Sequence, residues 1–180
     1  MKTLVIVRHA KSSWDDPSCS DFERTLNKRG ERDAPYMAQI TREKGIKADL
    51  IISSPANRAL TTAKYFAKEQ GIVDSNISQK ELIYNSGFSE ILRLLKKTDN
   101  SYNTVMLFGH NPDITHLTSY LLVIPSTIFQ HAGLLASISK RSINGLTSTI
   151  KTALCVSTFI HVNISANKFF SILTLLYCIL

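Results

Sequence analysis

Two histidines and two arginines of this chain lie at or after the ends of short apolar runs. If these runs are parallel strands, their carboxyl ends bring the four residues together. Arg8 and His9 end one run, His110 ends another, and Arg58 lies about one turn into the helix expected after a third. Ligands of open α/β sheets bind just beyond the carboxyl ends of the strands. Guanidinium groups bind phosphate oxygens through paired hydrogen bonds, and histidine acts as a nucleophile or an acid/base near neutral pH. Four such groups in one pocket would repel one another unless an anion joined them, so the spacing predicts a phosphoryl site.

Metal binding is the main alternative for a pair of histidines. Arginines rather than carboxylates or thiolates accompany His9 and His110, and a site for a cation would not be built with two guanidinium groups. We therefore expect no metal ion and no other cofactor at this site.

Alternating strands and helices must position these residues. Apolar patterning and turn residues predict strands at 3–8, 49–52, 77–79 and 104–108, and helices at 27–44, 55–70, 88–97 and 112–122. This alternation predicts an α/β fold, a three-layer α/β/α sandwich with a mostly parallel sheet. Ser54 and Pro55 are expected to begin the second helix, with a capping hydroxyl followed by proline in the first turn. Pro35 inside the first helix indicates a kink or a late start.

The bulk composition narrows the function classes. The chain has 180 residues, a length that suits one domain. Its net charge of +7 suits an anionic ligand. The basic residues are not clustered, and no zinc-finger or RNA-binding signature is present, so nucleic-acid binding is not expected. The three cysteines are scattered, and the first strand begins without a preceding signal peptide. We therefore expect a cytoplasmic protein, acting as a monomer.

The last third of the chain differs in composition from the rest. All 14 acidic residues lie at or before Asp113, whereas an average stretch as long as 114–180 would carry roughly 8 of them. We therefore divide the chain into a domain at 1–122 and an atypical acid-free region at 123–180. That region is a membrane segment, the strand-rich end of the domain, or the product of an altered reading frame. The longest uncharged run near the end, 169–180, is shorter than the ~20 residues that cross a bilayer, so no membrane span is expected.

Several motifs carry a resemblance to a known family. Three stretches, in order and at fitting spacing, resemble the histidine phosphatase superfamily: Arg8-His9-Ala10, Ser53-Ser54-Pro55-Ala56-x-Arg58-Ala59-x-x-Thr62-Ala63, and Gly109-His110-Asn111-Pro112. A longer stretch is similar to the small SixA-like phosphohistidine phosphatases: Arg8-His9-Ala10-Lys11-Ser12-Ser13-Trp14, followed by Asp21-x-x-Arg24-x-Leu26-Asn27-x-Arg29-Gly30. The resemblance covers roughly residues 1–122 and implies a phosphoglycerate mutase-like fold.

The resemblance also implies a role for each motif residue. His9 would be the nucleophile that accepts the phosphoryl group, and His110 would donate a hydrogen bond to it. The phosphate-binding residues would be Arg8, Arg24, Arg58 and Asn111. Two successive in-line transfers, to His9 and then to water, would need no metal because fixed cations already stabilise the transferred group.

Whether the reaction needs a general acid depends on the leaving group of the substrate. Larger relatives place a carboxylic acid after the third strand, and Glu81 is the nearest candidate here, although its surroundings do not match that site. Imidazole is a far better leaving group than an alkoxide and needs less help from an acid, which favours protein phosphohistidine as the substrate. Two alternatives stay open: a small-molecule phosphomonoesterase or mutase relative that uses Glu81, and a catalytically silent phosphate-binding protein.

Overall fold

The computed structural model describes residues 2–121, 159–165 and 168–175, which form an α/β fold. Its strands are β1 (Lys2–Arg8), β2 (Leu50–Ser53), β3 (Ser78–Gln79), β4 (Thr104–Gly109), β5 (Phe159–Ser165) and β6 (Lys168–Leu175). Its helices are α1 (Lys28–Glu43), α2 (Asn57–Gln70), α3 (Phe88–Lys97) and α4 (Asp113–Leu121), with the short 3-10 turns η1 (Asp74–Asn76) and η2 (Glu81–Ile83). Each strand and helix predicted before residue 122 is present in the structure.

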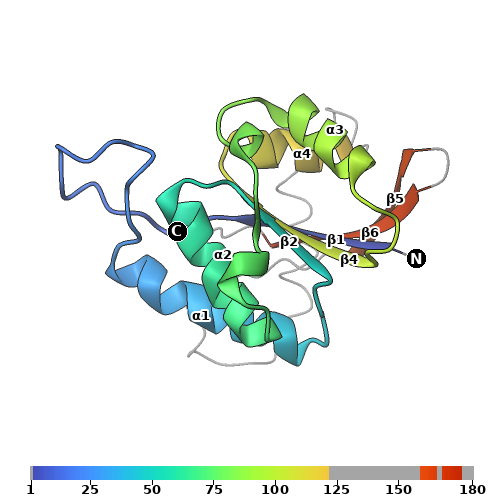
Figure 1. Cartoon of the computed structure of the whole chain (residues 1–180), viewed down its shortest axis with the longest axis horizontal. Helices are drawn as coiled ribbons and strands as arrows, with labels where there is room; N and C mark the ends of the chain where they lie inside the picture. Colours follow the sequence, from blue (N-terminus) through green and yellow to red (C-terminus); the bar gives the residue numbers. More distant parts are fainter. Residues whose placement is uncertain (1, 122–158, 166–167, 176–180) are drawn as a thin grey trace, which may run out of the picture.

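The described strands form one sheet in the order β3-β2-β4-β1-β6-β5. Within it every neighbouring pair is parallel except β5 and β6. β1 lies inside the sheet, between β4 and β6 (Figure 1). The mostly parallel sheet confirms the predicted fold class, and backbone pairing with β6 covers the side of β1 that faces away from β4.

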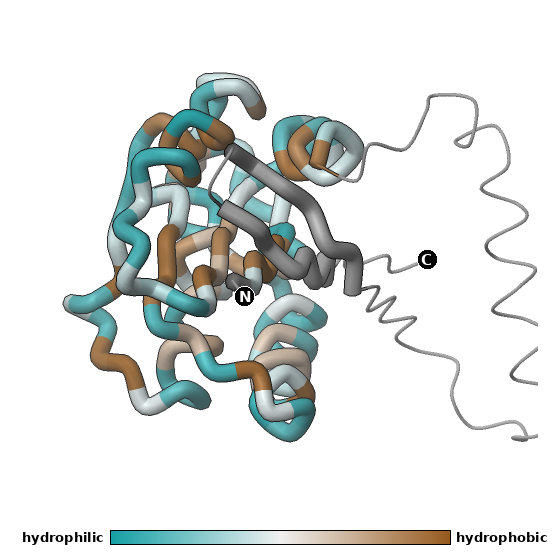
Figure 2. The backbone as a smooth tube through the Cα atoms, turned by 90° about the vertical axis from the view of Figure 1, so that its right-hand side faces the viewer, coloured by the Kyte–Doolittle hydropathy of each residue, from teal (hydrophilic) through white to brown (hydrophobic). Residues whose placement is uncertain are grey.

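The two faces of the sheet are covered by different helices (Figure 1). Successive β1 side chains alternate between two hydrophobic clusters, as the pleat of a strand requires. Leu4 and Ile6 pack in one cluster with α3 and α4, whereas Val5 and Val7 pack in the other with α1 and α2. All four side chains are fully buried, and Figure 2 shows hydrophobic segments in the interior with hydrophilic ones outside. The apolar run that begins the sequence is therefore a central strand of a three-layer sandwich.

The start of α2 and the position of Pro35 differ from the prediction. The helix begins at Asn57 after Ala56, and no side chain caps it, so Pro55 precedes the helix rather than lying in its first turn. The predicted cap was wrong because the Ser54 hydroxyl accepts from the backbone N–H of Ala56, ahead of the helix, and also contacts the ring of His110. Pro35 lies inside a continuous α1, which excludes the late start.

The long loop between β1 and α1 extends beyond the sheet and is closed at its base (Figure 1). Ser12 forms an isolated antiparallel bridge with Leu26, and the carbonyl of Lys11 accepts a hydrogen bond from the backbone N–H of Asn27. The Asn27 side chain caps α1 by accepting a hydrogen bond from Gly30 N–H at 2.9 Å. The base of the loop is thereby held against the first turn of α1.

Replacing Gly30 with alanine should destabilise the protein by about 2 to 3 kcal/mol, because the added Cβ would overlap the carbonyl oxygen of Lys11. Neither group can move easily, since one belongs to a helix and the other to the closed base of the loop. Urea unfolding of Gly30→Ala and wild type measures the effect. Gly71→Ala is the matched control: its Cβ meets open space, and its left-handed φ of 69° leaves only a backbone strain of about 1 kcal/mol. Equal losses in the two variants would contradict the prediction.

Predictions about the last third of the chain lie mostly outside the described residues. The altered reading frame and the division at residue 122 remain predictions. Among the helices that the structure describes, none has the length and apolar character needed to cross a membrane.

Candidate active site

Strand register brings His9 and His110 together. Arg8 on β1 lies opposite Gly109 on β4, so the next residue of each strand is a histidine. The backbone N–H of His9 donates to the Gly109 carbonyl at 3.1 Å, which extends the pairing one residue past the strand. As a result, the two imidazole ring centroids lie 5.1 Å apart. The predicted convergence of the two histidines at one edge of the sheet is present.

The contacts of His9 fix its tautomer. Nδ1 lies 2.7 Å from the carbonyl oxygen of Ala10, which can only accept, so Nδ1 carries the proton. Arg58 Nε–H donates to Nε2 at 3.3 Å, which requires a lone pair on Nε2. Burial lowers the pKa of His9 to about 4; the Ala10 hydrogen bond opposes this effect, and the charge of Arg58 adds to it. His9 is therefore neutral at physiological pH, and the lone pair of its Nε2 can act as a nucleophile once Arg58 releases it.

His110 is buried beside the same pocket. Its Nε2 lies 2.8 Å from the hydroxyl of Ser54, whereas its Nδ1 is buried without a hydrogen-bond partner among the described residues. Burial, followed by the charges of His9 and Arg58, lowers the pKa of His110 to about 3. A buried polar atom without a partner is uncommon in proteins. Among the described residues, His110 therefore has one ring nitrogen paired with Ser54 and one that is buried and unsatisfied.

Arg58 enters the site from the first turn of α2. Its side chain is buried, and its Nε–H is directed at His9. One turn further along α2, Thr62 accepts a hydrogen bond from the backbone N–H of Ala10 at 3.0 Å and donates its hydroxyl to the Arg58 carbonyl at 2.7 Å. Thr62 therefore ties the start of α2 to the segment that carries His9.

A pocket of about 290 Å³ opens over these residues. Among the described residues, its lining includes five arginine and lysine side chains, two histidines and no carboxylate: Arg8, His9, Ala10, Lys11, Ser12, Trp14, Arg24, Arg29, Arg58, His110 and Asn111. The structure thus brings together the predicted residues Arg8, His9, Arg24, Arg58, His110 and Asn111. Such a concentration of positive charge suits a dianionic phosphoryl group.

Several residues of the loop contact the Arg24 side chain. Nε donates to the Ser13 carbonyl at 2.9 Å, and Nη2 donates to the Ser12 hydroxyl. Its guanidinium carbon lies 3.2 Å from the centre of the Trp14 ring, while the Trp14 side chain remains 73% exposed. Arg24 therefore both anchors the loop and lines the pocket, and Trp14 presents open aromatic surface at its mouth.

Four residues at the site were not predicted to act there. Asp21 binds Arg24 and Arg58, Tyr84 donates its hydroxyl to Asp21, and Ser54 and Thr62 make the contacts given above. Three of them stand in the motifs that carry the resemblance, whereas nothing in the sequence near Tyr84 indicated its role. Glu81 is exposed in η2 and is absent from the pocket lining, so its role as an acid stays a prediction without a contact to support it.

The two histidines should titrate far below the usual histidine range of about 6.5. NMR titration of the ring C–H signals is expected to give midpoints near 4 for His9 and near 3 for His110. The unfolded chain binds these protons at higher pH than the folded one, so the free energy of unfolding should fall as the pH drops from 6.5 toward 4. His9→Asn should reduce that slope, whereas midpoints near 6.5 for both rings would refute the prediction.

Comparison with protein families agrees with the motifs. The family model described as "Histidine phosphatase superfamily (branch 1)" matches residues 4–91. An uncharacterized chloroplast protein of Arabidopsis thaliana is 36% identical over 118 residues, which cover 61% of this chain and 54% of that protein. The chain therefore spans about half the length of this relative.

Solved structures also match. The SixA protein of Agrobacterium tumefaciens is 30% identical with a TM-score of 0.60, over 66% of this chain and 76% of the other. The protein histidine phosphatase SixA complexed with tungstate is 23% identical with a TM-score of 0.57, over 65% and 75% of the two chains. The second match shows a shared fold, and the first shows a shared family.

Proposed function

Because the chain belongs to the histidine phosphatase superfamily, we propose that it is a phosphatase in which His9 takes a phosphoryl group from the substrate and passes it to water. The observation that carries the proposal is the state of His9. Its Nε2 holds a lone pair, fixed by the Ala10 carbonyl on one side of the ring and Arg58 on the other. That lone pair lies in a pocket lined by basic side chains, where a phosphoryl group would be attracted.

In the first transfer, Arg58 Nε–H leaves Nε2 for a phosphoryl oxygen, and the freed Nε2 lone pair forms a bond to phosphorus while the bond from phosphorus to the leaving group breaks. The leaving group keeps the electrons of that bond and takes a proton from water. Arg8 and Arg58 stabilise the negative charge on the three equatorial oxygens of the transferred group. His110 donates a hydrogen bond to one of those oxygens when its ring proton is on the nitrogen that faces them.

In the second transfer, a water oxygen attacks phosphorus, and the bond to Nε2 breaks. The water loses its proton to the phosphate product or to solvent, and Nε2 regains its lone pair. Nδ1–H can hold the Ala10 carbonyl throughout, so the ring keeps one orientation in both steps. The fixed cations supply charge stabilisation at each step, so we propose a metal-independent reaction.

Phosphohistidine on a protein is the substrate that we propose. No carboxylate lines the pocket among the described residues, and an imidazole leaving group needs less help from an acid than an alkoxide does. The exposed ring of Trp14 at the pocket mouth gives a flat imidazole a surface to stack on. The matched Agrobacterium protein also bears the name of a phosphohistidine phosphatase.

The test is to offer the full chain a phosphohistidine peptide and the matched phosphoserine peptide. We expect phosphate release from the phosphohistidine peptide with the higher kcat/KM, and an acid-labile phosphoryl group on His9 in the quenched protein. Preference for the phosphoserine peptide would support the phosphomonoesterase instead. Phosphate binding without turnover or label would identify a silent phosphate-binding protein.

A further inference from the structure

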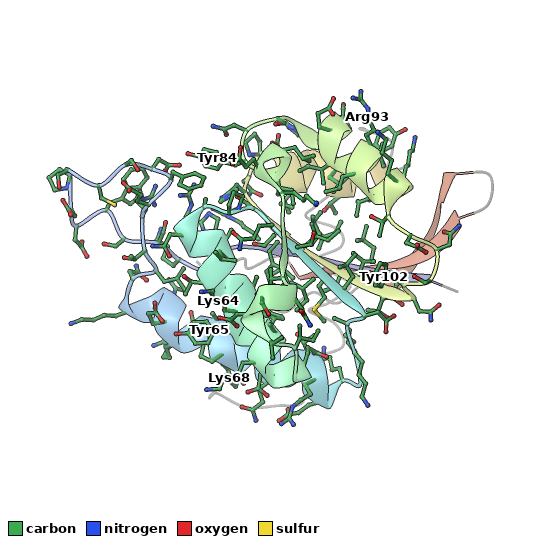
Figure 3. The ribbon with its side chains drawn as sticks, in the orientation of Figure 1. Lys64, Tyr65, Lys68, Tyr84, Arg93 and Tyr102 are labelled. Carbon is green, nitrogen blue, oxygen red and sulfur yellow. The ribbon has the colours of Figure 1, made fainter. Side chains whose placement is uncertain are left out.

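The carboxylate of Asp21 contacts both Arg24 and Arg58. Its Oδ1 accepts a hydrogen bond from Arg24 Nη1 at 2.7 Å, and its Oδ2 accepts one from Arg58 Nη2 at 2.8 Å. The backbone carbonyl of Asp21 also accepts a hydrogen bond from Arg58 Nη1. Tyr84, from the segment after η2, donates its hydroxyl to Oδ2 at 2.8 Å and lies near the loop (Figure 3). Asp21 therefore joins two arginines and a tyrosine that come from different parts of the chain.

These contacts set the orientation of the Arg58 guanidinium. Both of its terminal nitrogens donate to Asp21, while its Nε–H donates to His9 Nε2. A guanidinium group is planar and rigid, so holding the terminal nitrogens fixes the direction of Nε–H. Each terminal nitrogen also carries a second N–H, which is the donor that a phosphoryl oxygen would use. The position of Asp21 thus determines where Arg58 can meet both the nucleophile and the phosphoryl group.

The negative charge of Asp21 acts against binding of the substrate. Partial burial raises the pKa of the Asp21 carboxyl, but hydrogen bonds from Tyr84 and Arg58 outweigh that effect and leave the pKa below its usual value. The carboxylate is therefore ionised at neutral pH, and it attracts the same N–H groups that a phosphate needs. Removing the charge should leave phosphate binding as strong as before, or make it stronger.

We propose that Asp21 is a positioning residue: through Oδ2 and its own carbonyl it holds the Arg58 guanidinium so that the remaining N–H of each terminal nitrogen meets a phosphoryl group bound beside His9. This inference rests on the proposed function. It predicts that loss of Asp21 lowers kcat but not the affinity for phosphate, because a misplaced guanidinium still attracts phosphate but no longer matches the transition state.

The test compares Asp21→Asn with Asp15→Asn in the full chain. Asp15 is an exposed acid of the same loop, so both variants lose one negative charge from one loop. For Asp21→Asn we expect kcat with the phosphohistidine peptide to fall about 100-fold and inhibition by inorganic phosphate to be no weaker than in wild type, with the variant still folded at the assay temperature. Tyr84→Phe, which keeps the carboxylate but removes one of its donors, should give a smaller loss of kcat.

Two results would overturn the inference. One is a kcat for Asp21→Asn equal to that of Asp15→Asn. The other is a loss of kcat accompanied by an equal loss of phosphate affinity and a lower melting temperature, which would indicate a purely structural role.

A second readout separates this inference from the proposed function. The Arg58 Nε–H signal in a 15N NMR spectrum should be sharp in wild type, because its hydrogen bond to His9 slows exchange with water, and broad in Asp21→Asn. This comparison needs no turnover. If wild type has no activity but the signal broadens, the proposed function fails and the positioning by Asp21 stands. If the signal is unchanged while wild type is active, the inference fails and the function stands.

Discussion

Replacing His9 with alanine is expected to lower kcat/KM for the phosphohistidine peptide by about 10⁴-fold or more, and to remove the acid-labile phosphoryl label. The physical reason is that, in the proposed mechanism, Nε2 of this ring forms the bond to phosphorus. Steady-state phosphate release and mass spectrometry of the quenched protein measure the two effects.

Controls separate loss of the nucleophile from loss of the fold. His9→Asn removes Nε2 but keeps a side-chain N–H that can reach the Ala10 carbonyl, so it should be as inactive as His9→Ala while remaining folded. His116→Ala changes an exposed histidine on α4 and should retain wild-type activity. Both His9 variants should still bind inorganic phosphate, because the arginines remain. A phosphoryl label that persists in folded His9→Ala would place the nucleophile elsewhere.

Replacing Arg58 with alanine is expected to lower kcat/KM by about 10³-fold, the range that a charge-stabilising arginine supplies in phosphoryl transfer. The substitution removes the Nε–H donor to His9 and the N–H groups available to the phosphoryl oxygens, and it leaves Asp21 without one of its partners. Phosphate inhibition should weaken as well, which distinguishes Arg58→Ala from the split expected for Asp21→Asn. Phosphate release and competition by inorganic phosphate measure both quantities.

Two further variants sharpen the Arg58 prediction. Arg58→Lys keeps the charge but not the planar fork, so it should recover phosphate affinity better than it recovers kcat. Arg93→Ala removes an exposed arginine of α3 that pairs with Glu90 away from the pocket lining, and should behave as wild type (Figure 3). If Arg58→Ala kept the activity of Arg93→Ala, Arg58 would have no part in the transfer.

Much of the candidate site could be predicted because two of its residues follow the strands directly. His9 and His110 each come immediately after a short buried strand, and the pleat and parallel register of such strands leave little freedom in where the next residue lies. Arg58 was predictable for a similar reason, since it falls in the first turn of the helix that follows β2. Local sequence thus carried enough information to place three elements of the site.

The start of α2 shows where local reasoning failed. A serine followed by proline is a common beginning of a helix, yet the Ser54 hydroxyl contacts His110, which is 56 positions away in the chain. The Ser54 hydroxyl reaches that distant ring because β2 packs beside β4. No pattern within the segment itself contains that information.

The sequence by itself determined the α/β fold, the two strand ends followed by His9 and His110, the helix start that carries Arg58, and the family to which the chain belongs. The tertiary structure alone decided which nitrogen of His9 carries the proton, that Glu81 lies outside the pocket lining, and that Asp21 contacts both Arg58 and Tyr84. The physical reason is a difference in range. Strand and helix patterns arise from neighbouring residues, whereas hydrogen bonds across loops depend on how the closed loop after β1 folds back over α2 and the segment after η2.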